Sequence, residues 1–390
     1  MTPTTRLLAL LSLGNLVVGS SAFVVTGIVS PIAADLRVSA PAVGQAMTVY
    51  ALATAMLAPL AVVFTGGWTR KRALLLAWVL VLLGNLVCAT ADSLTQLLLG
   101  RVLLGAGSMF TPIAAALAVA SVPVSQRGKA LSVVFLGMSL AYVTGVPLGA
   151  WVGLQWGWQS AIGVMAALSA LMLVAVAWRV PVQLAAPGAS FGGLAGIVHR
   201  PEVLAVLAMT LCYFAAIFAV FSFAGPVLTA LVPMSAAQLS LTLALFGLSG
   251  VAGTLLGGAL ADRLGAPRSL RLMLPLLIGT MAVLPFTRGH YGWMMVVLLT
   301  WGVAGFSLMA PQQIRLAAMS PAQAPLLLSL NTSMLYFGMA VGAAAGGAAV
   351  VALGFAGLSW LGAPFALLAL VILWLGVTSP TSVAVSPRSS

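Results

Sequence analysis

Residues 203–231 read VLAVLAMTLCYFAAIFAVFSFAGPVLTAL and contain no charged side chain. A helix needs about 20 mostly apolar residues to cross the hydrocarbon core of a bilayer, and this stretch is longer than that. It also lacks the alternation of apolar and polar residues that a transmembrane β-strand shows. The stretch therefore predicts a membrane-spanning helix.

The rest of the chain has the same character. Of its 390 residues, 62% are hydrophobic and 5% are charged, whereas soluble domains carry about 25% charged residues. Only helices and closed barrels satisfy backbone polar groups in lipid, so we expect twelve transmembrane helices. Their expected spans are residues 7–29, 43–65, 73–90, 95–121, 131–153, 159–179, 203–231, 237–261, 270–287, 291–312, 325–350 and 357–378.

Basic residues indicate the orientation of these helices. Nearly all of the 16 Lys and Arg residues fall in loops on the side of the N-terminus, while only Arg37 and Arg288 fall in loops on the other side. Loops rich in Lys and Arg stay in the cytoplasm, so both termini are expected there. The bases are not clustered with aromatic residues, so the net charge of +12 does not indicate nucleic-acid binding.

The chain divides into two similar halves. The glycine spacing of Gly145, Gly149 and Gly153 recurs after the Pro- and Gly-rich break, at Gly338, Gly342 and Gly346. Duplicated bundles are typical of alternating-access transporters. We expect an all-α integral membrane protein of two pseudo-symmetric six-helix bundles, at residues 1–180 and 203–380, with a cytoplasmic linker at 181–202 and a cytoplasmic tail at 381–390.

The most specific motif is GALADRLG at residues 258–265. It resembles the G-x-L-A-D-R-x-G signature of the major facilitator superfamily, whose members use it to brace the cytoplasmic gate. The first-half copy, TGGWTRKR at residues 65–72, keeps the bases but has glycine in place of the acid. The resemblance implies the twelve-helix transporter fold, the inner membrane of a bacterium, and a gating role for Arg70, Asp262 and Arg263. The alternative is that both segments are plain turns between helices and have no gating role.

A second motif, GVPLG at residues 145–149, lies in the fifth expected helix. Glycine at every fourth position gives a smooth face for close helix packing, and Pro147 removes a backbone hydrogen bond and bends the helix. The surrounding residues 137–158 resemble the antiporter motif of the drug:proton antiporter branch of the superfamily, which implies export. Gly145, Pro147 and Gly149 are therefore either packing residues or a hinge of the gate.

Arg101 is a charge within the fourth expected helix. An arginine near the bilayer centre costs about 2.5–3.5 kcal/mol even on the lenient insertion scale, so partners must compensate it. None of the expected helices contains an acid that could do so. Arg101 must then bond to neutral groups, such as Asn15, Tyr142 or the carbonyls of a kinked helix, or to a substrate.

Polar and aromatic residues near helix centres are the candidates for substrate binding, because transporters of this kind bind solutes near the midplane. Each could instead be an interhelical contact. Together they favour a neutral or weakly polar, partly aromatic small molecule over a strong cation. They are Asn15, Tyr50, Arg101, Tyr142, Tyr213, Phe214, Phe218, Gln312, Asn331 and Tyr336.

Proton coupling needs a group that changes charge within the transport cycle. Stretches 23–36 and 331–347 resemble bacterial arabinose, sugar and purine-nucleoside efflux permeases, which often carry an acid just before the phenylalanine, where this chain has Ala22. Asp35, expected at the outer surface, is the best remaining coupling candidate; His199 and His290 lie in loops. Antiport through Asp35 and uncoupled export both remain open, with the resemblance favouring antiport.

Other classes of function fit less well. A membrane enzyme would need a buried nucleophile, an acid pair or a metal cluster, and the chain has no HExxH motif and no histidine within an expected helix. Duplicated halves and a gate motif argue against a channel or scramblase, and only the fifth-helix motif opposes uptake. We expect no enzyme activity, cofactor or metal. The expected partners of a monomer are a small-molecule substrate, the bilayer and protons.

Overall fold

The computed structural model describes residues 3–65, 67–123, 126–180, 200–320 and 323–377. Within these residues all regular structure is helical. Eleven helices are long and apolar enough to cross a membrane, and the shorter apolar helix Ser359–Leu375 provides a twelfth span. The predicted all-α membrane fold is thereby confirmed. Residues 181–199 of the expected linker and the expected tail at 381–390 lie outside the described residues.

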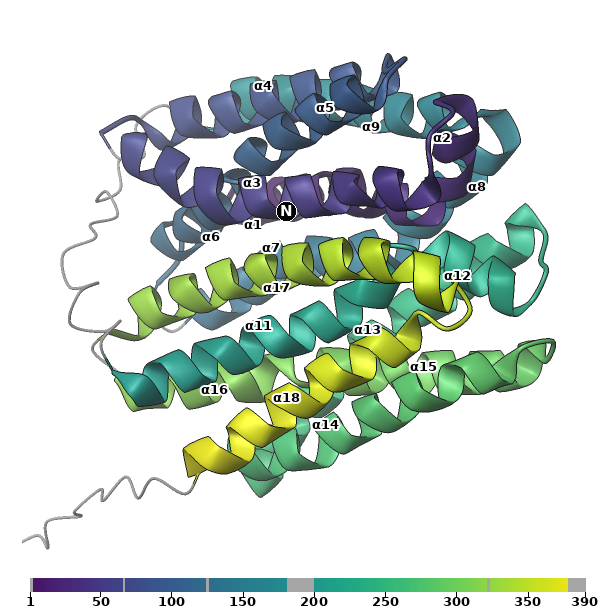
Figure 1. The fold of residues 1–390 in the computed structure, drawn as a ribbon. Coiled ribbons are helices and arrows are strands. Elements are labelled where there is room, and N and C mark those ends of the chain that lie inside the picture. Colours follow the sequence, from purple (N-terminus) through teal and green to yellow (C-terminus); the bar gives the residue numbers. More distant parts are fainter. Residues whose placement is uncertain (1–2, 66, 124–125, 181–199, 321–322, 378–390) are drawn as a thin grey trace, which may run out of the picture.

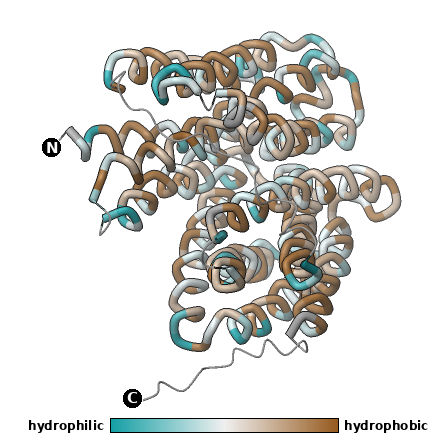
Figure 2. Tube along the Cα trace, turned by 90° about the vertical axis from the view of Figure 1, so that its left-hand side faces the viewer, coloured by the Kyte–Doolittle hydropathy of each residue, from teal (hydrophilic) through white to brown (hydrophobic). Residues whose placement is uncertain are grey.

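The helices form two groups, which Figure 1 shows one above the other. Apolar residues run along the helices of both groups in Figure 2. The first group contains α1 (Pro3–Phe23), η1 (Val24–Gly27), α2 (Val29–Asp35), α3 (Ala40–Phe64), α4 (Arg70–Ala89), α5 (Leu94–Gly107), α6 (Phe110–Ala120), α7 (Arg127–Leu140), the π-helix η3 (Ala141–Gly145), α8 (Val146–Trp156) and α9 (Trp158–Arg179).

The second group repeats this arrangement. It contains α11 (Pro201–Phe221), α12 (Ala224–Leu231), α13 (Ala236–Leu264), α14 (Ala266–Val283), η4 (Leu284–Thr287), α15 (Tyr291–Ser307), α16 (Met309–Met319), α17 (Ala324–Leu353) and α18 (Ser359–Val377).

The first helix of each bundle is broken, which corrects the expected continuous spans 7–29 and 203–231. In the first bundle α1 ends at Phe23 and a 3-10 turn leads into α2. In the second bundle α11 ends at Phe221 and α12 begins at Ala224. Apolar composition runs through both breaks, so hydropathy could not reveal them. The two breaks place helix ends inside the protein, where carbonyls that the next helical turn does not pair need other partners.

Glycine ladders hold each broken helix against a neighbour of its own bundle. A Cβ on Gly149 would meet Val24, and one on Gly153 would lie 2.7 Å from Ile28. In the second bundle, Cβ atoms on Gly342 and Gly346 would meet the carbonyl oxygens of Ala215 and Ala219. Both ladders therefore permit close packing within a bundle, as small residues do in membrane helices.

Gly265 makes the tight turn of the GALADRLG motif. It has a φ of 80°, a left-handed conformation that favours glycine, and it both ends α13 and precedes α14. A proline follows within the first turn of α14, where its missing N–H costs nothing. The motif thus forms a short connection between two membrane helices.

Candidate substrate site between the two bundles

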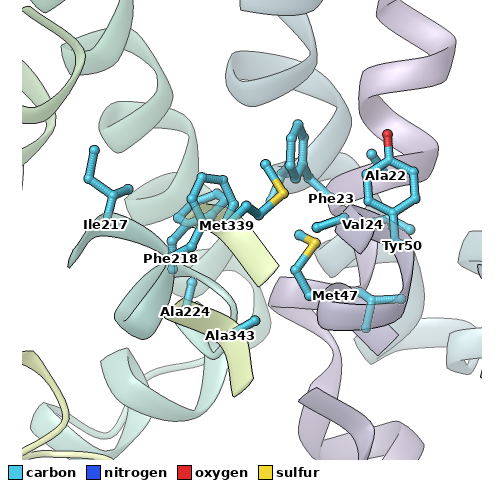
Figure 3. Close-up of a cluster of buried hydrophobic side chains, with 14 of the residues drawn as sticks. Ala22, Phe23, Val24, Met47, Tyr50, Ile217, Phe218, Ala224, Met339 and Ala343 are labelled. Carbon is cyan, nitrogen blue, oxygen red and sulfur yellow. The ribbon is translucent and has the colours of Figure 1, made fainter. Parts of the chain in front are cut away.

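Aromatic side chains from both bundles meet near the breaks in α1 and α11. The ring of Phe23 stacks on Tyr142 at 4.7 Å between centroids, and it lies 6.0 Å from Phe218 and 6.3 Å from Phe221. Figure 3 shows Phe23 and Met47 of the first bundle beside Met339 and Phe218 of the second. We call Phe23, Met47, Tyr142, Phe218, Phe221 and Met339 the central cluster.

Tyr142 joins the bundles at the π-helix. Its ring lies 5.9 Å from Phe221 and 5.3 Å from Phe306, both in the second bundle. A Cβ on Gly247 of α13 would meet the backbone oxygen of Tyr142, so the two backbones pass in close contact. The π-helix, which often marks functional positions, thereby places a predicted binding residue at the boundary.

Tyr50 and Tyr336 form a second contact across the boundary. Their rings lie 6.5 Å apart in an edge-on arrangement. The Tyr50 hydroxyl also shares a hydrogen bond of 2.9 Å with the hydroxyl of Ser108 on the adjoining segment of its own bundle. These two tyrosines bring polar groups close to the otherwise apolar cluster.

Arg101 is buried and binds the broken end of α1. Its Nη1 donates to the carbonyl oxygens of Ser21 at 3.0 Å and of Ala22 at 3.1 Å. The next carbonyl, that of Phe23, accepts from the hydroxyl of Thr26. The C-terminal end of a helix carries partial negative charge, so it compensates the guanidinium. Among the partners that the sequence left open, Arg101 therefore binds the carbonyls of a kinked helix.

Asn15 connects helices inside the first bundle rather than reaching the central cluster. Its Nδ2 donates to the carbonyl of Val134 at 2.9 Å, and its Oδ1 accepts from the hydroxyl of Thr111 at 2.8 Å. Both contacts lie between α1 and its neighbours, and the side chain has no exposed surface. This geometry is that of an interhelical contact.

Gln312 and Asn331 form the matching polar group of the second bundle. Gln312 Nε2 donates to the carbonyl of Val206 and to the Thr210 hydroxyl, which donates in turn to Asn331 Oδ1 at 2.6 Å. The Oε1 atom of Gln312 is buried without a hydrogen-bond partner. This cluster retains one acceptor atom without a partner, whereas both polar atoms of the Asn15 side chain have one.

Tyr213 and Phe214 extend the aromatic group along α11. Their rings lie 4.8 Å apart, and Phe214 stacks on Phe218 at 6.0 Å. Tyr213 is buried. They lie behind the central cluster, within the second bundle.

Several residues of the site were missed by sequence reasoning. Phe23, Met47, Phe221 and Met339 carry no signal that distinguishes them from lipid-facing residues. Asn85, which donates to the hydroxyls of Ser21 and Ser169 at 3.0 and 3.1 Å, could have been found as an amide within an apolar stretch. It fixes the chain beside the carbonyls that Arg101 binds.

The predicted gate residues lie away from the central cluster. Asp262 and Arg263 are exposed at the end of α13, and no ion pair of Asp262 occurs among the described residues. Arg70 is buried at the start of α4. Pro147, in contrast, lies at the boundary, because its carbonyl accepts from the Ser240 hydroxyl of the other bundle at 2.8 Å.

Asp35 is exposed at the end of α2. Its Oδ2 accepts from the indole N–H of Trp158 at 2.9 Å and from Gln159 Nε2 at 2.6 Å. All three residues belong to the first bundle. The carboxylate thus fastens α2 to α9 and lies outside the central cluster.

The two bundles close on each other at the end of the molecule that contains α2 and α12, at the right of Figure 1. A Cβ on Gly225 of α12 would lie 2.7 Å from the carbonyl oxygen of Gly27, and one on Gly347 would lie 2.6 Å from Gln45 Nε2. A Cβ on Gly44 would meet the ring of Phe223. At this end the two bundles are therefore in direct contact.

Known proteins are similar to this chain in sequence. The family pattern of the Major Facilitator Superfamily matches residues 11–321. The chain is 30% identical to the inner membrane transport protein YdhP of Escherichia coli (strain K12), over 96% of this chain and 97% of that one. It is 27% identical to an uncharacterized MFS-type transporter, YbcL of Bacillus subtilis (strain 168), over 93% of each chain.

A solved structure has the same fold. A bacterial homologue of the human lysosomal transporter Spinster, crystallised in an inward-facing and unoccupied conformation, superposes with a TM-score of 0.78. The match covers 96% of both chains at 16% sequence identity, so it concerns the fold alone.

Proposed function

The chain belongs to the Major Facilitator Superfamily, and from this premise we propose that it exports a small organic solute of the drug, sugar or nucleoside class by alternating access. Residues 1–180 and 203–380 are the two moving bundles, and residues 181–202 link them. With both termini in the cytoplasm, the closed end at α2 and α12 faces outward, and the solute enters from the cytoplasmic side.

The central cluster is the observation that carries this proposal. Its members come from both bundles, and they include polarizable methionines and aromatic rings that adapt to varied apolar ligands. Phe23 and Phe218 must move apart when the bundles rock. A solute bound there would be released by the same motion that opens the outer end.

The charge near the cluster restricts the solute. Arg101 is buried beside it, and none of the chain's four acids lies in the cluster. At an effective dielectric constant near 20, a cation about 10 Å from Arg101 is repelled by roughly 1.7 kcal/mol. We therefore propose neutral or anionic solutes and the exclusion of organic cations.

The test is efflux of a solute panel from cells that produce the wild-type protein, a Tyr142→Leu variant or a Leu171→Ala control. Leu171 is an exposed residue of α9, a helix that packs against α1, α4 and α8 of its own bundle. We expect the wild type and the control to lower the accumulation of neutral or anionic compounds, and Tyr142→Leu to reduce that effect. If no compound accumulates less with the wild type than without it, the proposal fails.

For coupling we propose proton antiport, which the family resemblance favours, through Asp35, the best remaining candidate among the acids. An uncoupled exporter is a second candidate, because Asp35 is exposed and bonded only within its own bundle. Proteoliposomes with an imposed pH gradient distinguish them. Antiport predicts that flux follows the gradient in the wild type and in Asp92→Asn, an exposed acid, but not in Asp35→Asn. Flux that ignores the gradient in all three proteins favours the uncoupled exporter.

A further inference from the structure

Two arginines lie on neighbouring helices at one edge of the second bundle, away from the central cluster. Arg271 lies near the start of α14, and Arg315 lies near the end of α16. The guanidinium carbon of Arg271 lies 4.9 Å from the centre of the Trp374 ring, near the end of α18. These helix ends are on the left of Figure 1.

Both arginines have donors that protein groups leave unsatisfied or poorly satisfied. The Nε atom of Arg271 is buried and has no hydrogen-bond partner. Nη1 of Arg315 contacts the thioether sulfur of Met209 at 3.8 Å, and a thioether is a weak acceptor. A guanidinium presents five donors in a fixed plane, so considerable donor capacity remains.

Among the described residues, no acidic side chain is paired with these charges. Arg271 and Arg315 are half-buried, and the two helices that carry them, α14 and α16, pack against each other. No ion pair to either is found in the described part of the chain, and the acids at this end, Glu202 and Asp262, are exposed. Like charges at a partly buried site destabilise each other. The pair is therefore suited to an external anion.

We propose that Arg271, Arg315 and Trp374 form a site for a phosphate-bearing anion at the membrane edge. Two planar guanidinium groups match the geometry of phosphate oxygens. Basic pockets between membrane helices bind lipid headgroups, and tryptophan favours the headgroup level. Trp374 is 55% exposed and Leu375 is 67% exposed, which favours an anionic phospholipid over a free ion as the source of the phosphate.

The test uses the full-length protein in nanodiscs of phosphatidylcholine, with or without phosphatidylglycerol, and measures thermal unfolding. We expect phosphatidylglycerol to raise the unfolding temperature of the wild type. We expect Arg271→Gln with Arg315→Gln to lose this rise. Arg268→Gln is the matched control, because it removes one charge from an exposed position on the same helix and should retain the rise.

Two further arms make the result decisive. Trp374→Leu keeps both charges, and we expect it to weaken the effect of phosphatidylglycerol about two- to fivefold; it also serves if the double variant fails to fold. Inorganic phosphate added to phosphatidylcholine nanodiscs tests the free ion. If inorganic phosphate raises the unfolding temperature of the wild type but not that of the double arginine variant, the site exists and its ligand is the free ion. If neither anion affects the wild type more than the variants, the site does not exist.

Discussion

At the residue scale, Arg101 shows how a buried charge is accommodated in a membrane bundle without an acid. Its burial is compensated by two carbonyls at the end of α1. The break after Phe23 frees these carbonyls, so the charge and the break depend on each other. The proposed exclusion of cations is therefore a consequence of how α1 is held.

Replacing Arg101 by methionine should lower stability. The carbonyls of Ser21 and Ala22 would each lose a partner, at about 1–3 kcal/mol per buried group. Removing one partner of a compensated pair is costly even when burying the charge was costly too. Thermal unfolding in detergent should show a lower midpoint for Arg101→Met than for the wild type. The midpoint of Arg288→Met, which changes an exposed loop residue, should be unchanged. Equal midpoints would mean that Arg101 does not hold the helix end.

The same residue marks the limit of prediction from sequence. An arginine in an apolar stretch requires neutral partners, and that requirement could be stated in advance. Which carbonyls meet it depends on where α1 breaks, and Val24, Val25 and Thr26 give no hydropathy signal for a break. Phe23 and Met339 were missed for a related reason, because residues facing the other bundle and residues facing lipid are equally apolar.

At the element scale, the positions of helices were predictable and their interruptions were not. Continuous apolar stretches gave all twelve spans, and glycine spacing gave the close-packed ladders. The ladder residues Gly149 and Gly342 pack inside their own bundles. The close approach between the bundles at the π-helix instead uses Gly247, whose spacing to Gly250, Gly253 and Gly257 does not tell which helix it faces. A role for Gly145, Pro147 and Gly149 as a hinge stays a prediction.

Gly247→Ala should weaken the closure between α13 and the π-helix, because its Cβ would meet the backbone oxygen of Tyr142. Overpacking of this kind costs about 1–3 kcal/mol, which lowers the closed-to-open ratio at least about fivefold. The test measures the rate of thiol labelling of Gln45→Cys in a protein with Cys88 and Cys212 replaced by alanine. This labelling rate should rise by a similar factor. Gly279→Ala is the control, since a Cβ there would meet nothing within 4 Å. Equal labelling in both variants would contradict this role for Gly247.

At the scale of the whole molecule, the proposed mechanism requires the closed end to open in every cycle. Contacts such as Gly27 with Gly225 and Gln45 with Gly347 join different bundles, whereas the glycine ladders join helices of the same bundle. Rocking of rigid bundles breaks the first kind of contact and preserves the second. Covalent links of the two kinds should therefore have opposite effects on transport.

Cysteines at Gln45 and Gly347, joined by a short thiol cross-linker in a background without Cys88 and Cys212, should abolish transport until the link is reduced. The matched control places cysteines at Thr90 and Gln96 of the first bundle, whose side chains are joined by a hydrogen bond of 3.3 Å. The same short cross-linker can therefore join them. The control should transport normally when linked, because both residues move together. Transport that continues with Gln45 and Gly347 linked would mean that the solute crosses without the bundles separating at this end, and alternating access would then be wrong.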